Sequence, residues 1–117
     1  PKDKAEEVAV EMLESSSDAL VIVVIDATRI ERGLHFALEV FERDRPVIVA
    51  LNMWDEAKKQ GADIDTDRLE TLLDVPVVTT VATEGVGVDR LVARFEEARS
   101  PSIETIQKQI ETAGRSR

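Results

Sequence analysis

The chain has 117 residues, a formal net charge of −9 and no cysteine. Its length suffices for one domain with one core, and a hydrophobic content of 43 % excludes a disordered segment of this charge. The acidity argues against nucleic acid and anionic membranes as direct partners, and the lack of cysteine excludes disulfides and thiolate metal sites.

Helical and strand patterns alternate along the first half of the chain. Residues 5–13 carry apolar side chains at helical spacing, and residues 19–25 form a short β-branched run, typical of a strand buried on both faces. Thr28 and Glu31 have the spacing of a capping box, which predicts that a helix begins there. The apolar face of that helix would consist of Ile30, Leu34, Ala37, Leu38 and Phe41.

The same alternation continues in the second half. A second strand is predicted at residues 47–51, a helix capped by Asp65 at about residues 67–73, and a third strand at residues 77–81. After a turn at residues 84–87, a further helix would bury Val88, Leu91, Val92 and Phe95. This order predicts an α/β fold with three layers, in which helices flank a mostly parallel sheet.

The tail, residues 100–117, differs in pattern. Ser100 suits a helix N-cap and Pro101 the first helical position, and Ile103, Ile106 and Ile110 make a narrow apolar stripe. We therefore predict a tail helix. Two interpretations stay open, a terminal helix that packs on the domain and the start of a further helical region.

Polar residues follow the second strand, where parallel sheets bind ligands. Asn52 and Asp55 form an N-x-x-D pattern. An ionised carboxylate accepts from two parallel N–H groups, and guanine offers such a pair in its N1–H and N2–H₂, whereas adenine does not. The Asn52 amide could donate near guanine N7 and tie neighbouring loops together, and the backbone N–H of Ala82 could donate to O6. The alternative is that Asp55 only caps the next helix.

Three segments, VIVVIDATRIERGL, PVIVALNMWD and DVPVV, resemble the cytosolic GTP-binding domain of the ferrous iron transport protein B family, with a likeness over about residues 18–91. The resemblance implies that Asn52, Met53 and Asp55 belong to a guanine-specificity motif. It also implies that Thr80, Val81 and Ala82 lie where the family has a T-S-A segment that contacts the base. Val81 departs from that pattern because it replaces the serine.

The resemblance implies a partial P-loop NTPase (Ras-like) G domain that binds GTP or GDP. Residues 1–99 would be the C-terminal part of this GTP-binding domain, and residues 100–117 the tail. The parent would be an integral membrane protein that transports ferrous iron, with this soluble segment on the cytoplasmic side of the membrane. Its partners would be the rest of the G domain and a membrane transport domain.

The sequence contains neither a G-x-x-x-x-G-K-S/T phosphate loop nor a D-x-x-G motif after a strand. We therefore expect the chain to begin just after the part that holds the triphosphate, and Mg²⁺ to bind only through that part. No residue is assigned a catalytic or metal-binding role, and the chain alone is expected not to hydrolyse GTP.

In the resembled fold, the first strand pairs with the strand that leads into the phosphate loop. Without that neighbour, the first strand would have an exposed edge, and a homo-oligomer formed through this edge is a hypothesis. A circularly permuted GTPase fragment and a non-catalytic α/β interaction module are the alternative functions.

Overall fold

The computed structural model describes residues 20–100, 104, 106–108 and 111. Within them, three strands form one parallel sheet in the order β1 (Val21–Asp26), β2 (Val47–Asn52), β3 (Val77–Thr79). Residues 47–51 of the central strand β2 are all buried, because β2 has a neighbour on each side and helices over both faces. The predicted parallel sheet is confirmed.

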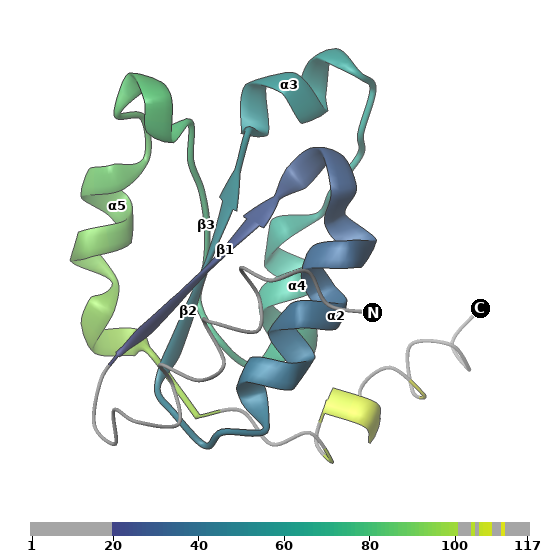
Figure 1. Ribbon diagram of the computed structural model, residues 1–117, viewed down its shortest axis with the longest axis vertical. Helices are drawn as coiled ribbons and strands as arrows, with labels where there is room; N and C mark the ends of the chain where they lie inside the picture. The colour runs from purple at the N-terminus through teal and green to yellow at the C-terminus, as the bar shows by residue number, and fades with distance from the viewer. Residues whose placement is uncertain (1–19, 101–103, 105, 109–110, 112–117) are drawn as a thin grey trace.

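Helices cover the sheet on both faces. The structure has α2 (Ile30–Phe41), α3 (Trp54–Lys59), α4 (Thr66–Leu73), α5 (Val88–Ala93) and the short 3₁₀ turns η1 (Ala27–Arg29), η2 (Ala82–Glu84) and η3 (Phe95–Glu97). In Figure 1, α5 lies on one side of the sheet, α2 and α4 lie on the other, and α3 lies beyond the end of β2. The predicted three-layer α/β architecture is therefore confirmed.

The main core lies between the sheet and α2. Ala37, Val40 and Phe41 of α2 are buried against the sheet residues Val23 and Ile25. Gly33 permits this packing, since a Cβ atom at that position would overlap the Ile25 side chain. The predicted helix after β1 is confirmed, and its apolar stripe is the reason it docks on this face.

The predicted capping box at Thr28 is wrong. Asp26 accepts hydrogen bonds from the backbone N–H of Thr28 at 2.9 Å and from its hydroxyl at 2.6 Å, and so caps η1. α2 begins at Ile30 without a side-chain cap. Because Asp26 caps η1, Thr28 lies inside that turn and not at the N-cap position of α2.

Two further expectations need correction. β3 ends at Thr79, two residues earlier than predicted, and Val81 instead forms an isolated antiparallel bridge with Val86. The face of α5 is also less covered than predicted, since Val88 is 39 % and Val92 55 % exposed. The predicted helix at residues 5–13 lies outside the described residues, as does most of the tail; Ile106 is buried in the core cluster.

An ion-pair network fastens α4 to the end of α5. The Arg94 guanidinium donates to both carboxylate oxygens of Glu70, at 2.7 and 3.0 Å, and also to Glu97 at 3.0 Å. Glu70 accepts a third hydrogen bond from the backbone N–H of Val77, at 2.8 Å. The hydrogen bond from Arg94 lowers the pKa of Glu70, while the two carboxylates raise the pKa of Arg94. This network positions the start of β3.

Candidate functional site

Two turns meet at the carboxyl end of the sheet, one after β2 and one after β3. The backbone N–H of Thr80 donates to the Leu51 carbonyl at 2.8 Å, and the Thr80 carbonyl accepts from the Trp54 N–H at 3.2 Å. Parallel pairing of β2 with β3 brings these turns to the same edge, and the two backbone bonds fix their spacing.

The Asn52 side chain ties the same two turns together. Its Oδ1 atom accepts from the Thr80 hydroxyl at 3.1 Å and from the Ala82 backbone N–H at 2.9 Å. Thr80 is only 3 % exposed, so its hydroxyl depends on this acceptor. Among the described residues the Asn52 Nδ2 group has no acceptor, which leaves its two N–H groups available to a ligand.

Asp55 is placed by an unusual turn. Met53 adopts a left-handed conformation, with φ 61° and ψ 31°, and is the N-cap residue of α3. A side chain other than glycine in that region costs about 1–2 kcal/mol, and such strain is often found at binding sites. Asp55 consequently lies in the first turn of α3 and is half-buried. Within the described part of the chain, its carboxylate makes no hydrogen bond or ion pair.

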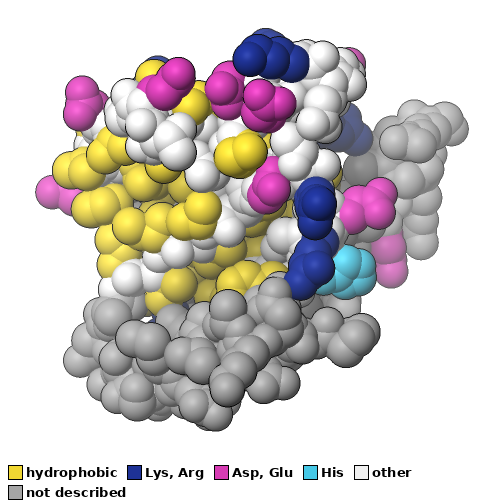
Figure 2. Space-filling view, turned by 45° about the horizontal axis from the view of Figure 1, so that its top comes forward, with side chains coloured by type: hydrophobic (Ala, Val, Ile, Leu, Met, Phe, Trp, Pro, Cys, Tyr) yellow, Lys and Arg dark blue, Asp and Glu magenta, His cyan; other side chains and the backbone are white. Residues whose placement is uncertain are grey.

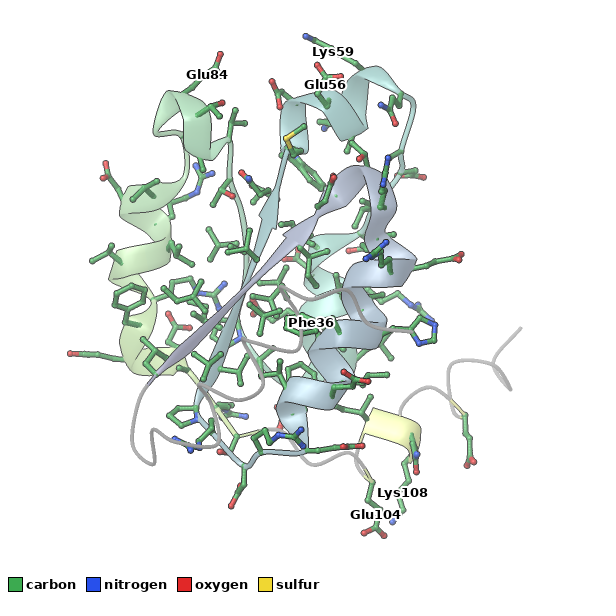
Figure 3. The ribbon with its side chains drawn as sticks, in the orientation of Figure 1. Phe36, Glu56, Lys59, Glu84, Glu104 and Lys108 are labelled. Carbon is green, nitrogen blue, oxygen red and sulfur yellow. The ribbon has the colours of Figure 1, made fainter. Side chains whose placement is uncertain are left out.

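The predicted site residues therefore gather on two adjoining turns. Asn52, Met53 and Asp55 come from the first, and Thr80, Val81 and Ala82 follow β3 on the second. Figure 3 shows charged side chains at this end of the molecule, Glu56 and Lys59 from α3 and Glu84 from η2.

The Ala82 N–H, which we expected to serve guanine O6, donates to Asn52 Oδ1 at 2.9 Å, so Asn52 ties the two turns together as the sequence suggested. Val81, which stands where the resembled family has serine, is buried, and its N–H and carbonyl pair with Val86 at 2.9 and 3.2 Å. Val81 thus closes a small hairpin that holds the Ala82 turn.

Sequence reasoning placed Gly87 in a turn but missed how Gly87 and Arg90 support the end of β3. Gly87 has φ +84°, and a Cβ atom there would collide with the Thr79 carbonyl oxygen. The Arg90 guanidinium donates to the same oxygen at 3.2 Å. The spacing of Gly85 and Gly87 around one valine was the available signal, since it marks backbone that must turn closely.

Trp54 and Lys58 form a further contact beside the site. The Lys58 Nζ atom lies 5.6 Å from the centroid of the Trp54 ring, within the range of a cation–π interaction. Trp54 is half-buried and packs against the core cluster. Its ring therefore supports α3 from the core side.

The carboxylate at the end of β1 is already engaged in a hydrogen bond within its own turn. Asp26 accepts hydrogen bonds from Thr28, and the bond from the Thr28 hydroxyl lowers the pKa of Asp26.

Among the residues that the structure describes, no cluster of three or more His, Asp or Glu side chains is arranged to hold a metal ion. None of the described helices is both long and apolar enough to cross a membrane.

Comparison with known proteins identifies the fold and the family. Residues 1–95 match the sequence model of the family described as ferrous iron transport protein B. The Fe(2+) transporter FeoB of Salmonella typhimurium is 44 % identical over 86 residues, which is 74 % of this chain and 11 % of that protein. The Escherichia coli Fe(2+) transporter FeoB is 41 % identical over 86 residues, again 74 % of this chain and 11 % of that protein.

Solved structures give the same result. The cytosolic domain of L. pneumophila FeoB superposes with a TM-score of 0.76 at 33 % identity, over 82 % of this chain and 42 % of that one. A mutant of S. thermophilus NFeoB bound to mGDP has a TM-score of 0.70 at 37 % identity, over 90 % of this chain and 39 % of that one. The chain thus spans less than half of each of these two solved chains. The family match and these superpositions together establish that the chain belongs to the ferrous iron transport protein B family.

Proposed function

We propose that the chain is the C-terminal, guanine-recognising part of a cytosolic G domain that regulates ferrous iron transport. The residues that carry this role are Asn52, Met53 and Asp55 after β2, with Thr80, Val81 and Ala82 after β3. The observation that supports it best is the pairing of a firmly held Asn52 with an Asp55 carboxylate that has no partner among the described residues.

The chemistry of the two side chains fits guanine. The Asp55 carboxylate would accept from N1–H and N2–H₂, a pair that adenine lacks. Asn52 has its oxygen engaged by Thr80 and Ala82, so its Nδ2 group would donate toward N7. Guanine O6 would share the Ala82 N–H with Asn52 in a bifurcated hydrogen bond. A site built this way rejects a base that leaves its polar groups unpaired.

The phosphates would be held by another part of the parent protein. The 117 residues contain no phosphate loop, and phosphate contacts position the nucleotide and its Mg²⁺ in P-loop proteins. Related solved structures are bound to mGDP and to GMPPNP, and in both cases this chain spans 39 % of the solved chain. The remaining G domain and a membrane transport domain are the partners we propose, with the chain on the cytoplasmic side.

A nucleotide titration tests this function. The chain joined to the parent sequence that precedes it should bind GDP and discriminate against ADP. Asp55→Ala removes a charge-assisted pair worth about 1.5–3 kcal/mol and should weaken GDP binding about 10- to 100-fold. Asp63→Ala is the matched control, because Asp63 is an exposed aspartate in the loop after α3.

Two results would decide against the proposal. Equal affinity for GDP and ADP would show that these turns do not read the base. No nucleotide binding by the longer protein would favour the alternative, an α/β interaction module without nucleotide.

A further inference from the structure

Charged side chains of two helices hold the outer edge of β3. The Thr80 N–H donates to the Leu51 carbonyl at 2.8 Å, so the backbone groups of Thr80 face β2. Because these groups alternate along a strand, the N–H and C=O groups of Val77 and Thr79 face the outer edge. Side chains of α4 and α5 bind these outward groups.

The two ends of this edge are held by different arginines of α5. At the amino end, Glu70 accepts from the Val77 N–H at 2.8 Å, and the Arg94 guanidinium lies 3.5 Å from the Val77 carbonyl oxygen. At the carboxyl end, the Arg90 guanidinium donates to the Thr79 carbonyl at 3.2 Å. Arg94 also binds two carboxylates, whereas Arg90 makes no other hydrogen bond or ion pair within the described part of the chain. Replacing Arg90 therefore removes a single contact.

The spacing of Gly87 and Arg90 explains why this contact forms. Gly87 is the N-cap residue of α5, and Arg90 follows three residues later, a spacing that places both on one face of the helix. Without a side chain, Gly87 lets the start of α5 approach the Thr79 carbonyl, where a Cβ atom would collide with the oxygen. Arg90 then reaches the same oxygen atom and fixes the end of β3 to α5.

The end of β3 leads directly into the turn that ties the candidate site together. The Thr80 carbonyl accepts from the Trp54 N–H at 3.2 Å, and the Thr80 hydroxyl donates to Asn52 at 3.1 Å. Trp54 is the residue immediately before Asp55. The relative placement of Asn52 and Asp55 therefore depends on where Thr79 and Thr80 lie.

We propose that Arg90 is a positioning residue for base recognition and that its contact with Thr79 strengthens the preference for guanine. By holding the Thr79 carbonyl against α5, Arg90 fixes the place of the turn after β3. Asn52 and Asp55 are aligned against that turn. Arg90 acts through the backbone and does not itself contact the nucleotide. This inference rests on the proposed function of Asn52 and Asp55.

An effect of the Arg90 charge alone would look different. Figure 2 shows Asp and Glu side chains gathered around the end of the molecule where α3 lies. Such a surface repels the phosphates of any nucleotide, so removal of a nearby positive charge would weaken GDP and ADP alike, and less so at high salt. Loss of a contact that aligns the two turns would weaken only the nucleotide whose base these turns recognise.

Nucleotide titrations of the chain joined to its preceding parent sequence test the proposal. Arg90→Met keeps the apolar stem and removes the donors, and it should weaken GDP binding about 3- to 10-fold while ADP binding stays unchanged, in low and high salt. Arg90→Lys retains a donor and should recover most of the GDP affinity. Arg68→Ala, which removes an exposed arginine of α4, is the control and should bind both nucleotides as the wild type does.

Amide hydrogen exchange of the same protein without nucleotide tests the positioning separately. The N–H groups of Trp54 and Ala82 each donate from one turn to the other. They should therefore exchange about 3- to 10-fold faster in Arg90→Met than in the wild type. The Val49 N–H, which donates from β2 to the Pro76 carbonyl, should exchange at the wild-type rate and so verify that the variant is folded.

Failure of this proposal can be told apart from failure of the proposed function. If the wild type prefers GDP and Asp55→Ala loses that preference while Arg90→Met keeps it, the proposed function stands and the role of Arg90 is wrong. Equal weakening of GDP and ADP by Arg90→Met, or unchanged exchange of the Trp54 and Ala82 N–H groups, would also overturn the role of Arg90. Equal affinity of the wild type for GDP and ADP would overturn the proposed function, and this inference with it.

Discussion

Replacing Asn52 should separate what this side chain does for the fold from what it does for the ligand. Asn52→Ala removes the acceptor of two hydrogen bonds, from the Thr80 hydroxyl and the Ala82 N–H. The buried Thr80 hydroxyl would be left without a hydrogen-bond partner, which costs about 1–3 kcal/mol of stability. Water can take the place of Asn52 at the exposed Ala82 N–H, so that contact costs less. We expect a loss of about 2 kcal/mol in the free energy of unfolding.

Asn52→Asp keeps an oxygen in the place of Oδ1 and should retain stability within ~1 kcal/mol. It replaces the Nδ2 donor with a second acceptor, however, and should lose guanine binding as Asn52→Ala does. The two variants therefore differ in stability and agree in binding. No purely structural role of Asn52 predicts that combination.

Urea unfolding, followed through the fluorescence of the single tryptophan, measures the stability. With an m-value of about 2 kcal/mol/M, the loss for Asn52→Ala corresponds to a midpoint lower by about 1 M. Gln60→Ala, at an exposed position after α3, is the control. The reasoning is refuted if Asn52→Ala unfolds at the wild-type midpoint, or if Asn52→Asp in the longer protein binds GDP as the wild type does.

Three other predictions follow from the described contacts. Glu70→Ala should cost ~1–2 kcal/mol, after allowance for its partial exposure, because Arg94 and the Val77 N–H lose their carboxylate. Arg94 lowers the pKa of Glu70 in the folded protein. The contribution of Glu70 to stability is therefore complete above its unfolded pKa, near 4.5, and is lost as the pH falls through its folded pKa. The unfolding midpoints of the wild type and Glu70→Ala should converge in acid. Gly87→Ala should cost ~1–3 kcal/mol in thermal unfolding, because its φ is positive and its Cβ would collide with the Thr79 carbonyl. The purified 117-residue chain should release no phosphate from GTP above a blank, and clear release would contradict the assignment of the phosphate site to another part of the parent.

Features set by short-range periodicity could be predicted from the sequence. The run Val21–Ile25 and the 3.6-residue stripe of residues 30–41 each correspond to one element of the structure. The predicted burial of the first strand on both faces is wrong, since Val23 and Ile25 are buried but Ile22 and Val24 are exposed. Asp65 caps α4, as its position before the apolar stripe indicates, by accepting from the Arg68 N–H at 3.1 Å. The proximity of Asn52 and Thr80 could also be predicted, because the carboxyl ends of parallel strands lie at the same edge of the sheet.

Features that depend on competition between neighbouring groups could not be predicted. Thr28 has a capping-box spacing, yet Asp26 caps the turn η1 and Thr28 lies inside that turn. The Ala82 N–H looked free for a ligand, but the Asn52 oxygen lies 2.9 Å away. The left-handed Met53 has no signal in the sequence, since glycine or asparagine is the usual residue in that conformation. These cases depend on contacts between neighbouring turns and on local backbone conformation, which residue spacing does not encode.

The central claim is that the Asp55 carboxylate accepts hydrogen bonds from N1–H and N2–H₂ of guanine. A variant that changes the hydrogen-bonding groups of residue 55 tests this claim most directly. Asn in place of Asp55 presents one acceptor and one donor, which matches xanthine, whose C2 bears an oxygen. In the chain joined to its preceding parent sequence, Asp55→Asn should bind GDP about 10- to 100-fold more weakly than the wild type and should prefer xanthosine diphosphate. An Asp55→Asn variant that keeps the wild-type preference for GDP would contradict the account.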